Sequence, residues 1–268
     1  MPLPSPSALF SLQGRRALVT GAGRGIGRAI ALGLAGAGAQ VALVARSASE
    51  LDEVAARVRE GGSPGRTAAT PGVVTVPADL ADTAALEDLA ETVSRRLGGV
   101  IDVVVHAAGV QARGRATELT DADFARVLTV NLTAPWRLST EVARRQLAAG
   151  VGGSHVMVAS MLAVTSRPEV SPYVASKTGL LGTVRALSTE WAPHGIRVNA
   201  LAPGYVATAL TSPMFEQPDW RQETLRRVPL GRFGQPEDLV GPALLLASDA
   251  GSYITGHLLT VDGGWTSS

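Results

Sequence analysis

Tyr173 and Lys177 are the two residues of this chain whose types and spacing are best suited to chemistry. Pro172 is typical of the first turn of a helix, and the hydrophobic residues that follow, from Leu180 to Trp191, recur at helical spacing. Residues four positions apart lie one turn from each other on the same helix face. An ammonium group in that position favours a phenolate and is expected to lower the pKa of the tyrosine toward working pH. A phenol tuned in this way can exchange a proton with a substrate hydroxyl.

Ser160 is a third candidate, because it directly follows a hydrophobic run at residues 155–159 that is typical of a buried strand. In α/β proteins the chemistry takes place at the carboxyl ends of the strands. A Tyr-x-x-x-Lys spacing also arises by chance, with the tyrosine packed on a helix and the lysine in solvent. The rest of the chain therefore has to distinguish a catalytic pair from a structural one.

The N-terminal part of the chain has the pattern of a dinucleotide-binding turn. Residues 16–20 form a short apolar strand that runs into the glycine-rich segment 21–27, and Ile26, Ile30 and Leu34 then repeat at helical spacing. Glycines allow the backbone to approach a pyrophosphate group, which rests on the free N–H groups of a helix N-terminus. The order of strand, turn and helix is the context that this fingerprint requires, so a nucleotide cofactor is expected here.

The residue after the second strand favours one form of that cofactor. This strand covers residues 40–45 and is followed by Arg46, whereas an acidic residue at its end would bind the ribose 2′-hydroxyl of NAD. A guanidinium can instead pair with a 2′-phosphate, and Arg24 in the glycine-rich segment can assist Arg46. The pattern favours NADP(H) and leaves NAD(H), with Arg46 simply at the surface, as the alternative.

Strands and helices alternate along the whole chain, which predicts an α/β protein with a doubly wound parallel sheet. The remaining strands are expected at residues 73–77, 101–105, 155–159, 195–201 and 257–261. Helices are expected at residues 49–60, 120–149, 172–191 and 236–248. We therefore expect a single-domain Rossmann fold in which seven parallel strands have helices on both faces.

The predicted domain covers residues 13–268 and follows a flexible N-terminal tail at residues 1–12. Residues 61–72 are rich in Gly, Pro, Ser and Thr and are expected to form a mobile insertion. Residues 205–232 carry aromatic side chains without clean periodicity, which is typical of a substrate lid.

Two further polar residues stand at positions where the backbone has unsatisfied groups. Asp79 follows the third strand and would accept a hydrogen bond from the adenine amine or, alternatively, cap the helix that begins near Thr83. Asn131 lies in the long helical pattern at 120–149, four residues before Pro135. A proline inside a helix frees the carbonyl four residues earlier, and a freed carbonyl needs a partner such as water.

Composition excludes several classes of function. Hydrophobic residues make up 46%, charged residues 18% and the formal net charge is +1, which gives no electrostatic argument for nucleic acid or an anionic membrane as partner. The chain has no cysteine, so disulfides, thiolate metal sites and cysteine nucleophiles are excluded, and the composition suits a reducing cytoplasm. The scattered histidines form no metal-binding pattern. The N-terminal residues lack the features of a signal peptide, and no stretch has the length of a membrane span.

Together these motifs resemble the short-chain dehydrogenase/reductase (SDR) family over essentially the whole chain. The matching positions, in order, are Thr20-Gly-x-x-x-Gly-Ile-Gly27, Asp79, Ala108-Gly109, Asn131, Ser160, Tyr173-x-x-x-Lys177, Asn199, Pro203-Gly204 and Thr208. Each motif alone is weak, but the ordered set is specific. The resemblance implies an NAD(P)-dependent oxidoreductase that transfers hydride between a nicotinamide cofactor and a secondary alcohol or ketone.

The resemblance also implies a role for each candidate residue. Tyr173 would be the acid/base, Ser160 would hydrogen-bond the substrate oxygen, and Lys177 would hold the nicotinamide ribose. The carbonyl of Asn131 would bind a water molecule in a proton relay to Lys177, in agreement with the effect expected from Pro135. The residues implied in cofactor binding are Gly21, Arg24, Gly25, Ile26, Gly27, Arg46, Asp79, Leu80, Ala107, Ala108, Gly109, Tyr173, Lys177, Pro203, Gly204, Val206 and Thr208.

One segment departs from the family pattern. The family usually has Asn-Asn-Ala-Gly where this chain has His106-Ala107-Ala108-Gly109. The contacts of that asparagine near the adenine ribose are then lost or made by the backbone. At the end of a buried strand, His106 is expected to be a hydrogen-bonded core residue rather than a catalytic base.

The C-terminal half is most similar to sugar-acid and polyol dehydrogenases of the family, such as gluconate 5-dehydrogenases. The 3-oxoacyl-[acyl-carrier-protein] reductases share much of the pattern and are the alternative. A non-catalytic dinucleotide-binding sensor is less favoured, because such a protein would be expected to lose part of the catalytic set. Family members are mostly homotetramers, so we expect an assembly with two-fold axes in which helices at 120–149 and 172–191 form interfaces.

Overall fold

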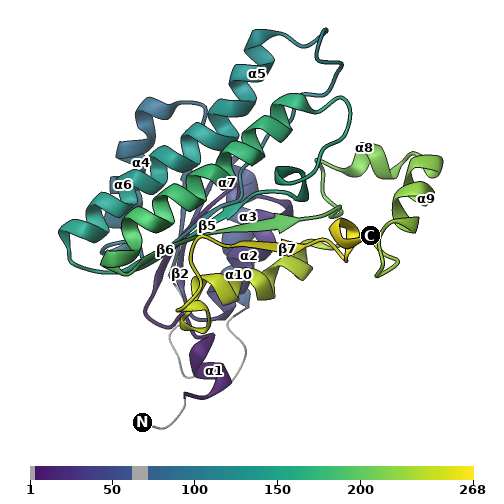
Figure 1. The fold of residues 1–268 in the computed structure, drawn as a ribbon. Helices are drawn as coiled ribbons and strands as arrows, with labels where there is room; N and C mark the ends of the chain where they lie inside the picture. Colours follow the sequence, from purple (N-terminus) through teal and green to yellow (C-terminus); the bar gives the residue numbers. More distant parts are fainter. Residues whose placement is uncertain (1–3, 62–71) are drawn as a thin grey trace.

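Within residues 4–61 and 72–268, which the computed structural model describes, seven strands form one parallel sheet (Figure 1). The strands are β1 (Arg16–Thr20), β2 (Gln40–Ala45), β3 (Val73–Pro77), β4 (Val103–His106), β5 (Gly153–Val158), β6 (Ile196–Pro203) and β7 (Leu258–Val261). Their order is β3-β2-β1-β4-β5-β6-β7, so the direction of winding reverses between β1 and β4. The predicted fold class is confirmed. In such sheets ligands bind outside the carboxyl ends of the strands at this switch point.

Helices cover both faces of the sheet (Figure 1). One layer consists of α2 (Gly25–Gly36), α3 (Ala48–Glu60) and α10 (Val240–Ala247). The opposite layer consists of α4 (Leu86–Leu97), α6 (Ala134–Ala148) and α7 (Ser171–Trp191). No helix in these described ranges is long and apolar enough to cross a membrane.

Successive residues of each strand face opposite helix layers. In β1, Ala17 and Val19 pack in the core beneath α2, whereas Leu18 packs in the core beneath α4. Likewise in β2, Leu43 belongs to the first core and Val44 to the second. Both faces of a strand are hydrophobic here because a parallel sheet in this architecture is buried on both sides. The continuous apolar runs in the sequence therefore correspond to strands.

The helix predicted at residues 120–149 is interrupted. It consists of α5 (Asp121–Leu128), a π-helical turn at Thr129–Thr133, and α6. Pro135 lies in the first turn of α6, and the N–H of Ala134 donates to the carbonyl of Thr129, five residues earlier. Because proline has no N–H, the α-helical ladder loses a bond and one extra residue is accommodated in the turn. This widened turn contains Asn131.

The segments expected to be least regular differ from one another. The predicted tail contains a short helix, α1 (Pro6–Leu9), and ends at Leu12, which is buried against the core. The predicted insertion at 61–72 lies, apart from its two ends, outside the described residues. The predicted lid contains two short helices, α8 (Ser212–Phe215) and α9 (Pro218–Arg226), which project from the sheet in Figure 1.

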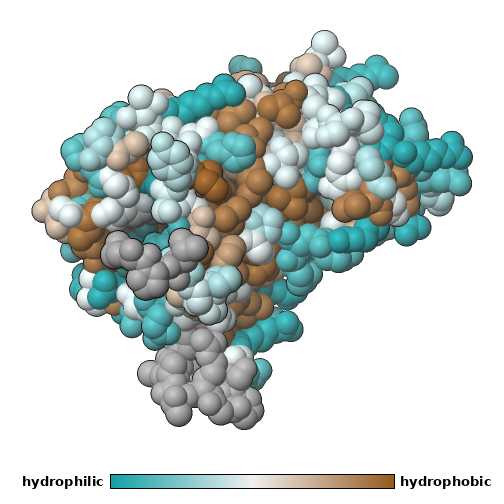
Figure 2. Space-filling view, turned by 60° about the horizontal axis from the view of Figure 1, so that its bottom comes forward, coloured by the Kyte–Doolittle hydropathy of each residue, from teal (hydrophilic) through white to brown (hydrophobic). Residues whose placement is uncertain are grey.

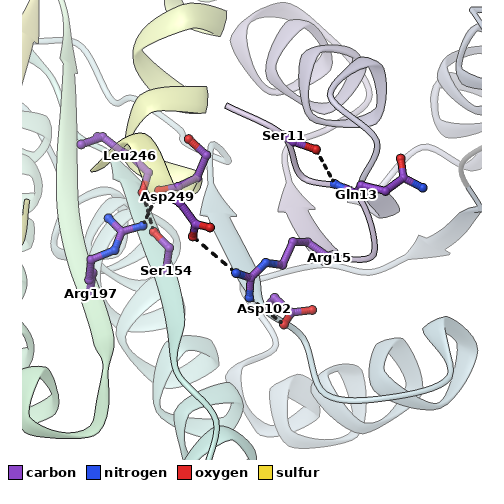
Figure 3. A network of polar contacts seen from close by, with 9 residues as sticks. Ser11, Gln13, Arg15, Asp102, Ser154, Arg197, Leu246 and Asp249 are labelled. Atoms are coloured by element: carbon purple, nitrogen blue, oxygen red, sulfur yellow. Dashed lines mark hydrogen bonds and ion pairs between the residues drawn. The ribbon is translucent and has the colours of Figure 1, made fainter. Parts of the chain in front are cut away.

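A polar network closes the amino end of the sheet (Figure 3). One oxygen of Asp102 accepts the backbone N–H of Arg16 at 2.8 Å, and the other lies 3.6 Å from the guanidinium of Arg15. Arg15 also reaches Asp249, in the C-terminal third of the chain, at 3.4 Å. These ion pairs at the amino ends of the strands are thus separate from the cavity, which lies at the carboxyl ends.

Candidate active site

A cavity of about 730 Å³ lies at the carboxyl ends of the strands, within the size range of small-molecule and cofactor sites. Residues that follow β1 to β6 line it. Every residue predicted to bind cofactor or to act in catalysis lines this cavity except Asn131, which lies behind it. Two charged residues that sequence reasoning missed, Glu50 and Arg126, also line it. The sheet topology therefore brings the separate motifs together in one place.

The glycine-rich turn after β1 is shaped for a phosphate group. Gly21 has φ +66°, and a Cβ there would lie 2.6 Å from the backbone nitrogen of Ala108. A Cβ on Gly27 would collide with the carbonyl oxygen of Gly21. Arg24 is the N-cap residue of α2 and makes no side-chain capping bond, so the first N–H groups of the helix lack a side-chain cap. Such a cradle at a helix N-terminus fits the pyrophosphate of a dinucleotide.

Beside this turn, the end of β2 carries charged groups. Arg46 directly follows Ala45 and lines the cavity, and no acidic residue occupies the end of the strand. Arg24 lies across the same part of the cavity, where its guanidinium is 3.8 Å from a carboxylate oxygen of Glu50. The two arginines suit a 2′-phosphate. Glu50 was not identified from sequence because its place in the motif Ser-x-x-Glu is typical of a helix cap.

Asp79 does not cap a helix. One of its carboxylate oxygens accepts the N–H of Ala81 at 3.0 Å, and the 3₁₀ turn that begins at Thr83 is capped by Asp82, whose oxygen accepts the N–H of Ala85 at 3.3 Å. The capping alternative for Asp79 is therefore wrong. Asp79 and Leu80 line the cavity after β3, which is compatible with the adenine contact expected for them.

Tyr173, Lys177 and Ser160 meet at the other end of the cavity. Tyr173 and Lys177 lie in the first two turns of α7, and the Lys177 Nζ is 5.6 Å from the centre of the phenol ring. Lys177 is only 3% exposed, and its Nζ donates a hydrogen bond to the carbonyl of Val158 at 2.7 Å. The Ser160 Oγ accepts the N–H of Leu162 at 3.1 Å, so its hydroxyl hydrogen remains for the phenol of Tyr173 or for a ligand.

The surroundings of Tyr173 and Lys177 disfavour the charged form of each side chain, and the pKa values shift accordingly. Burial raises the pKa of the Tyr173 phenol, although hydrogen bonding with Ser160 and the positive charge of Arg113 act in the opposite direction. Burial lowers the pKa of Lys177 to about 8. The expectation that Lys177 lowers the pKa of Tyr173 is therefore wrong for this structure, because loss of solvent outweighs the neighbouring charges.

The Asn131 side chain connects the loop after β4 to α7. Its oxygen accepts the N–H of Val110 at 2.8 Å, and its nitrogen donates to the carbonyl of Val110 at 2.9 Å and to the Oγ of Ser176 at 3.1 Å. The Ser176 Oγ in turn donates to the carbonyl of Tyr173 at 2.7 Å. Asn131 is fully buried, so these bonds satisfy an amide that would otherwise be costly. The Asn131 side chain thus holds the loop after β4 and helix α7 together. The group of Asn131 that remains for the predicted water molecule is its main-chain carbonyl.

His106 is a core residue, as expected. It is 2% exposed at the end of β4, and its Nε2 lies 2.7 Å from the Oγ of Ser139. Burial, with smaller contributions from His155 and Lys177, lowers the pKa of His106 to about 3, so the ring is neutral at physiological pH. A ring with so low a pKa that is not among the residues lining the cavity is not a candidate for the catalytic base.

The segment after β6 closes the cavity over the glycine-rich turn. A Cβ on Gly25 would lie 3.4 Å from the Cγ2 of Thr208. The Oγ1 of Thr211 accepts the N–H of Thr208 at 3.0 Å and donates to the carbonyl of Val206 at 2.6 Å. These bonds hold a tight loop, together with Pro203 and Gly204, against the side of the cavity expected to receive the nicotinamide.

Stacked aromatic rings attach the lid to the end of β6. Phe215 stacks on Phe233 with a centroid separation of 4.3 Å, and Trp220 lies parallel to Phe233 at 6.1 Å. The rings of Tyr205 and Trp220 meet nearly at right angles, with their centroids 5.2 Å apart. Such ring pairs contribute about 0.5–1.5 kcal/mol each beyond the area they bury. The helices α8 and α9 are therefore anchored through rings rather than through the main core.

This arrangement defines a class of protein. A parallel sheet with a phosphate cradle at its switch point, facing a serine, a tyrosine and a lysine, is the site of a dinucleotide-dependent oxidoreductase. In the described part of the chain, no group of three or more His, Cys, Asp or Glu side chains could hold a metal ion.

Comparison with known proteins identifies the family. The family model described as enoyl-(acyl carrier protein) reductase matches residues 21–266. The chain is 38% identical over 256 residues to the 2-dehydro-3-deoxy-D-gluconate 5-dehydrogenase of Dickeya dadantii (strain 3937), covering 96% of this chain and 97% of the relative. It is 37% identical over 258 residues to the gluconate 5-dehydrogenase of Gluconobacter oxydans (strain 621H), covering 96% and 97%.

A solved structure agrees over the whole fold. The gluconate 5-dehydrogenase from Burkholderia cenocepacia J2315, in complex with NADP and tartrate, has a TM-score of 0.91 and 33% identity, covering 98% of this chain and 100% of that one. The chain belongs to the short-chain dehydrogenase/reductase family of oxidoreductases, as its motifs predicted.

Proposed function

We propose that this protein is an NADP(H)-dependent dehydrogenase of a secondary alcohol in a sugar acid, similar to gluconate 5-dehydrogenases. The single observation that carries the proposal is the meeting of Ser160, Tyr173 and Lys177 on one wall of the cavity that also contains the glycine-rich turn. The names of the relatives, which act on gluconate derivatives, support the substrate class. The NADP in the Burkholderia structure supports the cofactor.

In this proposal the Tyr173 Oη takes the proton of the substrate hydroxyl during oxidation and returns it during reduction. The Ser160 hydroxyl donates a hydrogen bond to the same substrate oxygen and holds it beside the phenol. Because burial raises the pKa of Tyr173, positive charge near the ring is needed to stabilise its deprotonated form. Arg113 supplies part of that charge, and the hydrogen bond with Ser160 acts in the same direction.

The cofactor residues proposed from sequence remain proposals, and their placement supports them. When bound, the nicotinamide would supply the hydride acceptor or donor for the substrate carbon. The N-terminus of α2 would hold the pyrophosphate, Arg24 and Arg46 the 2′-phosphate, Asp79 and Leu80 the adenine, and Lys177 the nicotinamide ribose. The loop from Pro203 to Thr208 would exclude water from the reacting face.

We also propose that the main-chain carbonyl of Asn131 holds a water molecule that carries protons to Lys177. The π-helical turn and Pro135 support this, since the α-helical partner of that carbonyl would be the N–H that proline lacks. The Asn131 side chain and Lys177 are also close: a Cβ on Gly109 would lie 3.6 Å from the Asn131 Oδ1 and 3.9 Å from the Lys177 Nζ.

Charge beside the phenol favours an acidic substrate. Arg113 lies close enough to Tyr173 to influence its pKa. The pKa of the Arg113 guanidinium is itself lowered, first by burial and then by the nearby charge of Arg167. Among the described residues neither arginine forms an ion pair; Arg113 bonds the side-chain oxygen of Gln111 and Arg167 the sulfur of Met214. Neither arginine lines the cavity, and Arg113 also interacts with the charge of Glu169, but guanidiniums on this side of Tyr173 are suited to a substrate carboxylate.

The second candidate is a 3-oxoacyl thioester reductase with the same proton chemistry. The description of the matching family model, which refers to an acyl-carrier-protein reductase, favours it. The stacked rings of the lid, Phe215, Trp220 and Phe233, do not line the cavity, but they offer an apolar surface of the kind that suits an acyl chain. The two candidates differ in whether the substrate carries a negative charge near its reacting carbon.

Steady-state turnover distinguishes these candidates. The purified protein is assayed with NADP+ and NAD+ against gluconate-type sugar acids, neutral polyols and simple secondary alcohols, and in reverse with ketones and a 3-oxoacyl thioester. We expect the highest kcat/KM with a sugar acid, and a loss of at least about 10²-fold in Tyr173→Phe. Preference for the thioester would select the second candidate. Cofactor binding without turnover on any compound would leave a dinucleotide-binding sensor.

We propose that the protein assembles as a homotetramer and works in the cytoplasm. Trp136 and Leu147 on α6 and Phe124 on α5 are all exposed, Trp136 to 46%, which is expected of an interface rather than a free surface. Figure 2 shows that hydrophobic residues also gather in patches across the middle of the face it presents.

The lack of cysteine supports a reducing compartment. A monomeric mass by light scattering would contradict the assembly, and fractionation of the source cells tests the compartment.

A further inference from the structure

Glu50 is a carboxylate at the part of the cavity where the cofactor carries its most negative group. It lies in the first turn of α3, and the N-cap Ser47 accepts its backbone N–H at 3.3 Å. Its side chain reaches the glycine-rich turn, because a Cβ on Gly23 would lie 2.6 Å from the Glu50 Oε2. The other oxygen, Oε1, lies 3.8 Å from the guanidinium of Arg24.

The positive charges at the end of the cavity near the glycine-rich turn are therefore not all available to a ligand. Of the two arginines that line it, Arg24 already has a carboxylate partner, whereas Arg46 has no ion pair within the described ranges. A 2′-phosphate has to share Arg24 with Glu50 or separate the pair, and it meets a second negative charge in either case. The ribose of NAD(H), which carries a 2′-hydroxyl in place of the phosphate, does not compete with Glu50 for Arg24.

We propose that Glu50 competes with the 2′-phosphate of NADP(H) for Arg24, and so reduces the preference of the protein for NADP(H) over NAD(H). The inference rests on the proposed placement of the 2′-phosphate beside Arg24 and Arg46. It makes Glu50 a residue that sets cofactor specificity without contacting the reacting atoms. A dehydrogenase with this device can use either cofactor according to their relative concentrations.

The expected change in NADP+ affinity follows from how far the Arg24 and Glu50 side chains are exposed to solvent. The side chains of Arg24 and Glu50 are 66% and 37% exposed, so water and salt weaken their attraction. Removing the carboxylate charge while keeping the shape of the side chain, in Glu50→Gln, should tighten NADP+ binding by about three- to fivefold. NAD+ binding should change by less than about twofold. The gain should shrink as salt is raised toward 0.5 M, because the interaction is between exposed charges.

Binding is measured directly, by calorimetry or quenching of tryptophan fluorescence, for NADP+, NAD+, 2′,5′-ADP and 5′-AMP. Glu53→Gln is the matched control: it makes the same charge change three residues further along α3 at an exposed position that does not line the cavity. We expect it to leave all four dissociation constants unchanged within about twofold. Weaker or unchanged binding of NADP+ and 2′,5′-ADP in Glu50→Gln, or equal gains for all four ligands, would overturn the proposal.

A double-mutant cycle tests whether the effect acts through Arg24. In an Arg24→Ala background the gain from Glu50→Gln should fall below about twofold, and a gain of full size would overturn the competition for Arg24. The cycle also separates this inference from the cofactor site on which it rests. If neither Arg24→Ala nor Arg46→Ala weakens NADP+ binding relative to NAD+, the placement of the 2′-phosphate is wrong. If both weaken it and Glu50→Gln has no effect, only the role of Glu50 is wrong.

Discussion

At the scale of single residues, the site is governed by loss of solvent more than by charge pairing. Tyr173 and Lys177 are neighbours on α7, and spacing alone predicts that the ammonium stabilises the phenolate. In the structure the Lys177 Nζ instead bonds the carbonyl of Val158, and burial shifts the pKa of both groups toward their neutral forms. The pair therefore needs the charge of its ligands and of Arg113 before it can exchange protons efficiently.

Lys177 offers a direct test of this environment, because it is the only lysine in the chain. Protein grown with lysine labelled at the ε-carbon should give one side-chain resonance in an NMR spectrum. With the pKa lowered to about 8, the resonance should titrate around pH 8 rather than above pH 10. Because the folded-state pKa lies below the unfolded one, this lysine costs stability below pH 8 and the cost disappears as pH rises toward 10.5. Titration above pH 10 in the folded protein would contradict the buried environment.

At the scale of elements, the π-helical turn positions the site from outside it. Asn131 uses its whole amide to connect the loop after β4 to α7, so this side chain helps to set the distance between the two. A serine on α7, Ser176, extends the connection to the backbone of Tyr173. The structural role of such residues is recognised from their hydrogen bonds in the structure, and not from the chemical type of the side chain in the sequence.

We expect Asn131→Ala to be costly in two separable ways. It leaves the N–H and C=O of Val110 without partners, which should lower the free energy of unfolding by about 1–3 kcal/mol. It should also speed hydrogen exchange at residues 107–112 and lower kcat while the affinity for NADP+ falls only slightly. Asn131→Asp keeps the acceptor and loses the donor, so it should be intermediate. Slow exchange in the loop of Asn131→Ala would show that other contacts hold it.

Much of this element structure is predictable from the sequence, for stated reasons. The bounds of β1, β2 and β3 agree with the prediction residue for residue, because turn residues bound these short runs on both sides. The strands predicted at 101–105 and 155–159 instead begin at Val103 and Gly153, because apolar character alone does not mark where pairing starts. Pro135 indicates an interruption, but propensity does not distinguish a kink from a widened turn. The side chain of Glu50 is predicted poorly, since a Ser-x-x-Glu motif indicates a cap and only the fold shows that the carboxylate reaches Arg24.

At the scale of the whole molecule, two buried histidines couple stability to pH. His106 and His155 both have a pKa lowered to about 3 by burial, and each has one ring nitrogen without a partner among the described residues. Both rings must therefore be neutral in the folded protein. Because the folded pKa lies below the unfolded value of 6.5, stability is complete above pH 6.5 and falls as pH decreases toward 3.

Replacing His106 with asparagine, the residue usual at this position in the family, should reduce that dependence. Each such histidine contributes a slope of about 1.4 kcal/mol per pH unit in the window between pH 3 and 6.5. Unfolding by urea at several values between pH 4 and 7 should show a shallower loss of stability for His106→Asn. His194→Asn, at an exposed position, controls for the loss of a histidine as such. An unchanged slope in His106→Asn would mean that other groups cause the loss in acid.

The helix α10 has a consequence for how the chain is made. Residues Leu239, Ala243 and Leu246 complete the same core that begins at Leu12, and Val240 packs directly against Gly33 on α2. A ribosome delivers α2 early and α10 much later, so the surfaces of α2 and β5 that α10 covers stay exposed for most of synthesis. Nascent chains halted before residue 236 should remain sensitive to protease, and full protection should follow only after release. Completion of this core therefore waits for α10, and until then the growing chain exposes apolar surface that would otherwise be buried.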